Sequence, residues 1–155
     1  MSGKGPGANK ALVRRYYEEM WNRWDLSLAE ELLTPNVRFR GSLGTEGCGI
    51  RDFRRYARHV WLAFPDFYNK IEELIGEADR VVARLTYTGT HRGELMGIAP
   101  TGRAVRYEGA AWFRIEGGRI AELWVAADRL ALLEQIGSFG GGRAAKPPLR
   151  RPGRL

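Results

Sequence analysis

The spacing of apolar residues changes once along this chain, near Phe67, and that change limits the possible folds more than any other feature. Before it, apolar side chains recur every three or four residues, the spacing of amphipathic helices. After it, they alternate with polar residues, the spacing of strands with one buried face. Helices followed by strands predict an α+β domain in which a curved antiparallel sheet wraps around the N-terminal helices.

We expect three helices and one brief strand in the first half. The first helix covers residues 8–24, a short second helix follows Asp25 and Ser27 and stops at Pro35, and a strand at 37–42 precedes the third helix at 50–64. The second half predicts an antiparallel meander of four strands joined mainly by tight turns, at residues 67–75, 80–90, 104–115 and 119–126. A final helix at 128–136 ends at Gly137.

Length and charge predict one folded domain between two tails. A chain of 155 residues can bury about two thirds of its unfolded surface without a disulfide or a metal. We place the domain at residues 9–137, a flexible N-terminus at 1–8 and a disordered basic tail at 138–155. The tail holds five of the positive charges and Lys4 another, which leaves residues 5–136 with +1 of the +7 of the whole chain. We therefore do not expect nucleic acid as a partner.

The composition also argues against several other classes of protein. Cys48 is the single cysteine, and no cluster of cysteine and histidine has the spacing of metal ligands, so we predict neither a disulfide nor a metal site. No apolar run approaches the length of about 20 residues that a membrane span needs, and residues 1–9 lack the apolar block of a signal peptide. We expect a cytoplasmic protein that does not bind membranes.

Two ionisable side chains lie where predicted strands end. His91 follows one strand and opens a turn-rich loop, and Asp128 follows the last strand. Loops at a sheet edge often carry pocket chemistry. Strand alternation places His91 on the apolar face of its strand and Tyr107 on the face that we take as inward, and it groups Glu122 with Trp124 and Asp128. Convergent polar groups among aromatic side chains are typical of a small-molecule site.

Six segments carry a more specific signal. Five lie at residues 9–17, 64–66, 89–93, 100–103 and 118–124, and the sixth consists of Asp128 followed by residues 132–137. Together they resemble the SnoaL-like polyketide cyclases, a branch of the nuclear transport factor 2-like superfamily. The resemblance extends from about residue 9 to residue 137 and leaves both tails unmatched. It implies a cone-shaped α+β fold that is usually oligomeric, so we expect a homodimer or a higher homo-oligomer.

The resemblance also implies a reaction. Type members of the family close a ring by an intramolecular aldol reaction on an aromatic polyketide ester, without cofactor or metal, and a carboxylate near the end of the last strand acts as acid and base. Asp128 matches that position best, and His91 would hydrogen-bond to the developing enolate or alkoxide. The remaining candidates are substrate-binding residues, namely Tyr107, Trp124, Trp112, Tyr16, Phe64 and Glu122.

The chain departs from the family pattern at two places. Val125 and Ala126 follow the tryptophan of the last strand where members often carry Asp-Val, and Arg40 stands where many have a histidine. Two other enzyme classes of this fold match less well. A limonene-type epoxide hydrolase needs an arginine and an aspartate two residues apart on an inner strand, but that spacing occurs here only in Arg23 and Asp25 at a helix end. A ketosteroid-type isomerase needs a base near the first strand, where this chain has Arg38, Phe39 and Arg40.

Structural explanations of the same residues stay open. A carboxylate at the start of a helix is an ordinary N-cap, which could be the whole role of Asp128. His91 could be a buried structural histidine, and the aromatic residues could simply fill the core. We predict an enzyme of secondary metabolism acting on a polyketide-like small molecule. The alternatives are another ring-forming or isomerising enzyme, or a protein that binds a small molecule without catalysis.

Overall fold

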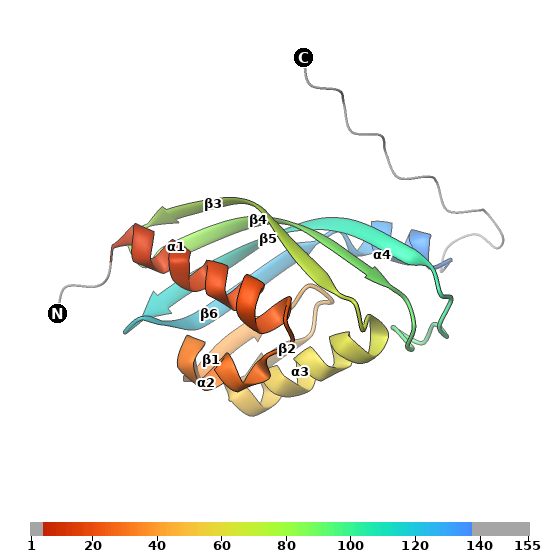
Figure 1. The fold of residues 1–155 in the computed structure, drawn as a ribbon, viewed down its shortest axis with the longest axis horizontal. Helices are drawn as coiled ribbons and strands as arrows, with labels where there is room; N and C mark the ends of the chain where they lie inside the picture. Colours follow the sequence, from red (N-terminus) through yellow and green to blue (C-terminus); the bar gives the residue numbers. More distant parts are fainter. Residues whose placement is uncertain (1–4, 138–155) are drawn as a thin grey trace, which may run out of the picture.

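The computed structural model describes residues 5–137, in which helices lie along one face of a single curved sheet (Figure 1). The strands are β1 (Leu33–Arg40), β2 (Glu46–Cys48), β3 (Tyr68–Glu77), β4 (Arg80–Thr90), β5 (Ala104–Glu116) and β6 (Arg119–Ala127). Their order across the sheet is β2-β1-β6-β5-β4-β3, and only β1 and β6 pair in parallel. The predicted α+β architecture and the meander from β3 to β6 are confirmed.

The helices are α1 (Pro6–Arg15), α2 (Ala29–Leu32), α3 (Gly49–Ala63) and α4 (Arg129–Gln135). The first begins at Pro6, two residues earlier than expected, because proline fits the first turn of a helix. The predicted second helix is reduced to a 3₁₀ turn and the four residues of α2. No helix within residues 5–137 is both long and apolar enough to cross a membrane. The predicted basic tail at 138–155 lies outside the described residues.

A π-helical segment, Tyr16–Trp21, continues α1. The backbone N–H of Asn22 donates to the carbonyl of Tyr17, five residues earlier, at 2.8 Å. This wider turn directs two consecutive side chains toward the sheet, so that Tyr16 and Tyr17 are both buried. Both rings contact Phe113 of β5, at centroid distances of 5.4 and 5.8 Å.

The first strands differ most from the expectation. β1 begins at Leu33 instead of residue 37 and includes Pro35, which lies where the pairing of β1 with β6 is interrupted. Proline is tolerated there because no ladder hydrogen bond needs its missing N–H. No strand was expected between residues 42 and 50, but the three residues of β2 pair with the end of β1. The sequence of these three residues does not predict a strand. β2 is a strand because it forms hydrogen bonds with β1.

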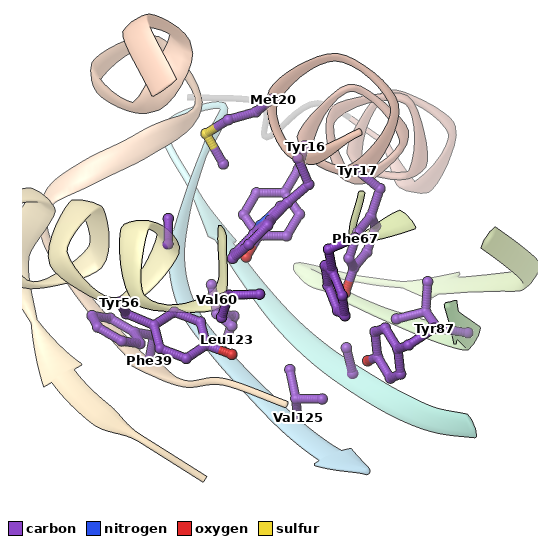
Figure 2. Packing of buried hydrophobic residues seen from close by; sticks show 14 of the residues in the cluster. Tyr16, Tyr17, Met20, Phe39, Tyr56, Val60, Phe67, Tyr87, Leu123 and Val125 are labelled. Atoms are coloured by element: carbon purple, nitrogen blue, oxygen red, sulfur yellow. The ribbon is translucent and has the colours of Figure 1, made fainter. Parts of the chain in front are cut away.

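The core lies between the helices and the sheet face that they cover, a space that we call the interior. Side chains from α1, α3 and the sheet meet there (Figure 2). On β4, alternate residues from Val81 to Tyr87 face the interior and are almost fully buried. On β5, the alternation places Tyr107 and Phe113 on the same side. The inward faces predicted for these two strands are therefore confirmed.

Two asparagines join the first helical segment to the edge strand β3. The Asn22 side chain accepts hydrogen bonds from the backbone N–H of Asn69 at 2.8 Å and from its side-chain amide at 3.2 Å. It also donates to the Asn69 carbonyl at 2.9 Å. Asn69 is buried, so water cannot replace these bonds.

Replacing Asn22 by alanine should lower the free energy of unfolding by about 2–3 kcal/mol, because it leaves buried polar groups of Asn69 without partners. Chemical denaturation at constant m-value would measure the loss. Asn22→Asp, which keeps the acceptor and loses only the donor, should cost less. An equal loss in both variants would show that the acceptor oxygen is not what stabilises this junction.

Candidate functional site

Three strands end at the same edge of the sheet. β4 and β6 run in one direction because each is antiparallel to β5, and β1 is parallel to β6. The residues that follow these strands are therefore on one side of the fold, which we call the rim. Ser42, His91 and Asp128 lie there, as does α4, which follows β6 (Figure 1).

His91 is fully buried, as its strand alternation predicts. Its ring packs against Phe64 with a centroid distance of 5.9 Å. The backbone N–H of Thr101 points at Nδ1 from 3.3 Å, and the Thr101 hydroxyl lies 3.0 Å from the same nitrogen. Because a backbone N–H can only donate, Nδ1 accepts and the neutral ring carries its proton on Nε2. Burial lowers the pKa of His91, and a backbone group at Gly93 partly opposes this effect.

Backbone contacts fix the loop that follows His91. The N–H groups of Arg92 and Gly93 both donate to the carbonyl of Ala63 at the end of α3, at 2.9 and 3.2 Å. A Cβ at Gly93 would lie 2.0 Å from the carbonyl oxygen of Leu62, so only glycine fits this close approach. The loop therefore holds the imidazole of His91 against the end of α3.

Two tyrosine hydroxyls in the interior have no hydrogen-bond partner among the described residues. They belong to Tyr87 of β4 and Tyr107 of β5, whose rings lie 4.9 Å apart. Both side chains are almost completely buried (Figure 2 shows Tyr87). Burial raises the pKa of both phenols. Both are therefore hydrogen-bond donors at neutral pH.

A third tyrosine connects this pair to α3. The Tyr56 hydroxyl lies 3.3 Å from the hydroxyl of Ser42, which follows β1. Burial also raises the pKa of Tyr56. Among residues 5–137, no aspartate or glutamate is buried. The interior thus contains neutral donors and no carboxylate.

Asp128 is exposed and caps α4. Its Oδ1 accepts from the N–H of Ala131 at 3.0 Å, and its own N–H donates to the carbonyl of Glu108 at 2.9 Å. The backbone of His91 instead pairs with Arg103. Glu108, the partner of Asp128, and Arg103, the partner of His91, are five residues apart, which corresponds to about 17 Å along an extended chain. Asp128 and His91 share the rim, but the structure does not bring the two side chains together.

Three of the predicted substrate-binding residues lie on the outer face of the sheet, away from the interior. Trp112 and Trp124 are paired across β5 and β6, and each is 47% exposed. Glu122 forms ion pairs with Arg114 at 3.4 Å and with Arg80 at 4.0 Å. Strand alternation grouped Glu122 with Trp124 correctly but does not show which face the helices cover. None of the three lines the interior.

The other predicted residues, Tyr16, Phe64 and Tyr107, do face the interior. Tyr87, Tyr56 and Thr101 were not among the predicted residues. Tyr87 shares the inward face of β4 with His91, which was a usable signal. Nothing in the sequence indicated that Thr101 would reach back to His91. Within residues 5–137, no group of three or more histidine, cysteine, aspartate or glutamate residues is placed to hold a metal ion.

Comparison with known proteins places this geometry in a family. The sequence profile of the SnoaL-like polyketide cyclases matches residues 11–136. A search of curated proteins found no match.

Several solved structures are similar. AclR from Streptomyces galilaeus, described as a candidate hydroxylase, is 30% identical over 90% of this chain and 87% of its own, with a TM-score of 0.76. TsrD from Streptomyces laurentii is 26% identical over 88% and 100% of the two chains, with a TM-score of 0.79. IdmH from Streptomyces antibioticus, described as a candidate polyketide cyclase, is 27% identical over 83% and 98%, with a TM-score of 0.72. Since the profile covers most of the chain, this protein belongs to the SnoaL-like polyketide cyclase family.

Proposed function

We propose that this protein is a cofactor-independent enzyme that closes a ring on a polyketide-derived small molecule by acid/base chemistry. The substrate would extend from the tyrosine hydroxyls of the interior to the rim at Asp128. The observation that carries the proposal is the pair of buried, unpartnered hydroxyls of Tyr87 and Tyr107. A buried polar group without a partner costs about 1–3 kcal/mol, and a ligand carbonyl oxygen would remove that cost.

An aldol closure matches these donors. A base removes a proton from the carbon next to one carbonyl, and the resulting enolate carbon bonds to the carbon of a second carbonyl. That second oxygen gains negative charge and takes up a proton. Neutral donors in an apolar interior stabilise such charge best, because no water competes for the oxygen. The raised pKa values of Tyr87 and Tyr107 keep both phenols protonated for this role.

Asp128 is the proposed base. The backbone N–H of Asp128 donates to the carbonyl of Glu108, which directly follows Tyr107 in the chain. A substrate held by Tyr107 would therefore extend toward Asp128. Only Oδ1 is used by the helix cap, and Oδ2 makes no hydrogen bond within residues 5–137. His91, farther along the rim, would serve as an additional donor through Nε2–H.

A second candidate function is binding of a small molecule without catalysis. Two observations favour it: Asp128 already has a structural role as the cap of α4, and no carboxylate is buried among the described residues. The names of the similar structures include both a candidate hydroxylase and a candidate cyclase, so the fold leaves the reaction open. Variants of Tyr87 and Asp128 separate binding from catalysis.

Replacing Tyr87 by phenylalanine should have opposite effects on folding and on binding. Removal of an unpartnered buried hydroxyl should raise the free energy of unfolding by about 1 kcal/mol. The same change should weaken binding of an uncharged fused-ring ketone, for example 1,8-dihydroxyanthraquinone, by about fivefold. Denaturation and fluorescence titration measure the two effects. A loss of stability with unchanged affinity would mean that Tyr87 has only a structural role.

His91 should make folding less favourable in mild acid. Its pKa is lowered in the folded protein, so below its ordinary value of 6.5 the unfolded chain binds a proton more readily. Unfolding free energy should therefore fall as the pH drops from about 7.5 to about 5. His91→Asn, which keeps an acceptor for Thr101, should reduce this fall in unfolding free energy. The control His59→Asn, at an exposed position, should not reduce it. Equal pH profiles for all three proteins would contradict the assignment.

Asp128→Asn tests the catalytic role of Asp128 apart from its role as the helix cap, because asparagine caps a helix about as well as aspartate. The variant should keep its stability within about 0.5 kcal/mol. Its turnover of an aromatic polyketide ester that carries an activated methylene and a ketone should fall by about 100-fold or more. Product chromatography and solvent deuterium exchange at the methylene would follow the reaction. Asp128→Ala, the control for the cap, should in addition lose about 1 kcal/mol of stability.

Undiminished turnover by Asp128→Asn would remove Asp128 as the base. Binding of such esters by the wild type without any deuterium exchange would favour the non-catalytic function.

A further inference from the structure

A groove lies between α3 and the turn that joins β1 to β2. Its volume is about 690 Å³, within the range of pockets that hold small organic ligands. One wall consists of Arg51, Arg55 and Arg58 of α3, and the other includes Glu46 of β2. No step of the proposed ring closure uses this groove.

The three arginines of the wall are exposed and form no ion pair with any described residue. The same helix provides a contrast in Arg54, which faces away from the groove and pairs with Glu30 at 3.4 Å. Arginine is usually found with an acidic partner where one is within reach. The wall therefore presents guanidinium groups that can take up an external anion.

The groove also contains two carboxylates, which set a limit on its positive charge. Asp52 is already engaged, since its Oδ2 accepts from the backbone N–H of Cys48 at 3.2 Å. Glu46 lies on the wall facing the arginines and makes no ion pair with a described residue. Three arginines against two carboxylates leave the groove with an excess of one positive charge.

The remaining lining of the groove combines the polar residues Thr45 and His59 with apolar side chains. Phe39 and Tyr56 lie at its floor and are only 4% and 5% exposed (Figure 2 shows both rings). Leu62, which is 62% exposed, extends this surface toward the end of α3. A small inorganic anion would contact the arginines and leave the apolar surface open to water. An organic anion would cover both, because its apolar part buries the exposed surface of Leu62 while its charge meets the guanidinium groups.

We propose that this groove binds an organic carboxylate, held at its charged end by Arg55 and Arg58 and at its apolar part by Leu62. Arg51, at the start of α3, adds to the positive potential. Neither Tyr87 nor Tyr107 lines the groove, so the site does not depend on the proposed ring closure. Guanidinium groups bind a carboxylate in a planar, two-point geometry that suits such a ligand.

Titration calorimetry with anthraquinone-2-carboxylate would test the site on the full chain. Arg55→Gln and Arg58→Gln should each weaken binding about fivefold to tenfold, since each removes a charged hydrogen-bond donor. Arg54→Gln loses the same charge from the same helix outside the groove and should stay within about twofold of the wild type. Glu46→Gln removes the opposing charge and should strengthen binding by about twofold to threefold.

Two further ligands test the chemistry. The uncharged anthraquinone-2-carboxamide should bind about tenfold more weakly, and inorganic phosphate should bind more weakly still.

Absence of binding by the wild type would overturn the proposal. An effect of Arg54→Gln equal to that of Arg55→Gln would do the same, because it would indicate a general response to net charge. Equal affinity for the carboxylate and the carboxamide would show that the arginines do not select the ligand.

Discussion

The unbroken pairing of β4 with β5 is the constraint on which the rest of the structure depends. Eleven consecutive residue pairs join these strands, from Arg80 with Arg114 to Thr90 with Ala104. No bulge interrupts the alternation, so every second side chain on both strands faces the helices. The depth of Tyr87 and Tyr107 in the core follows directly from this register. A shift by one residue would move both hydroxyls to solvent.

The interior combines strong burial with neutral polar groups. Its tyrosines stay protonated because ionisation would place a charge in apolar surroundings, and His91 stays neutral for the same reason. Any proton acceptor that is charged at neutral pH must therefore lie outside the interior. This separation explains why the proposed chemistry is divided between buried donors and a carboxylate at the rim, and why Asp128 is exposed.

Helix α3 serves two surfaces at once. Its buried side, which includes Phe53, Tyr56 and Val60, packs on the core. Its arginines face the groove beside β2. Tyr56 belongs to both regions, because its ring lines the groove while its hydroxyl meets Ser42 near the interior tyrosines. The groove and the interior therefore meet at this residue.

The sequence by itself determined the first, third and last helices, the four-strand meander and the inward faces of β4 and β5, because periodicity reports which side of an element is buried. It therefore placed His91 and Tyr107 correctly, whereas the predicted homo-oligomer and basic tail stay predictions. Only the tertiary structure decided that Trp112 and Trp124 lie on the outer face, that β2 is a strand, and that β5 separates Asp128 from His91. Those outcomes depend on which strands become neighbours, and residues far apart in the chain supply the pairing that fixes them.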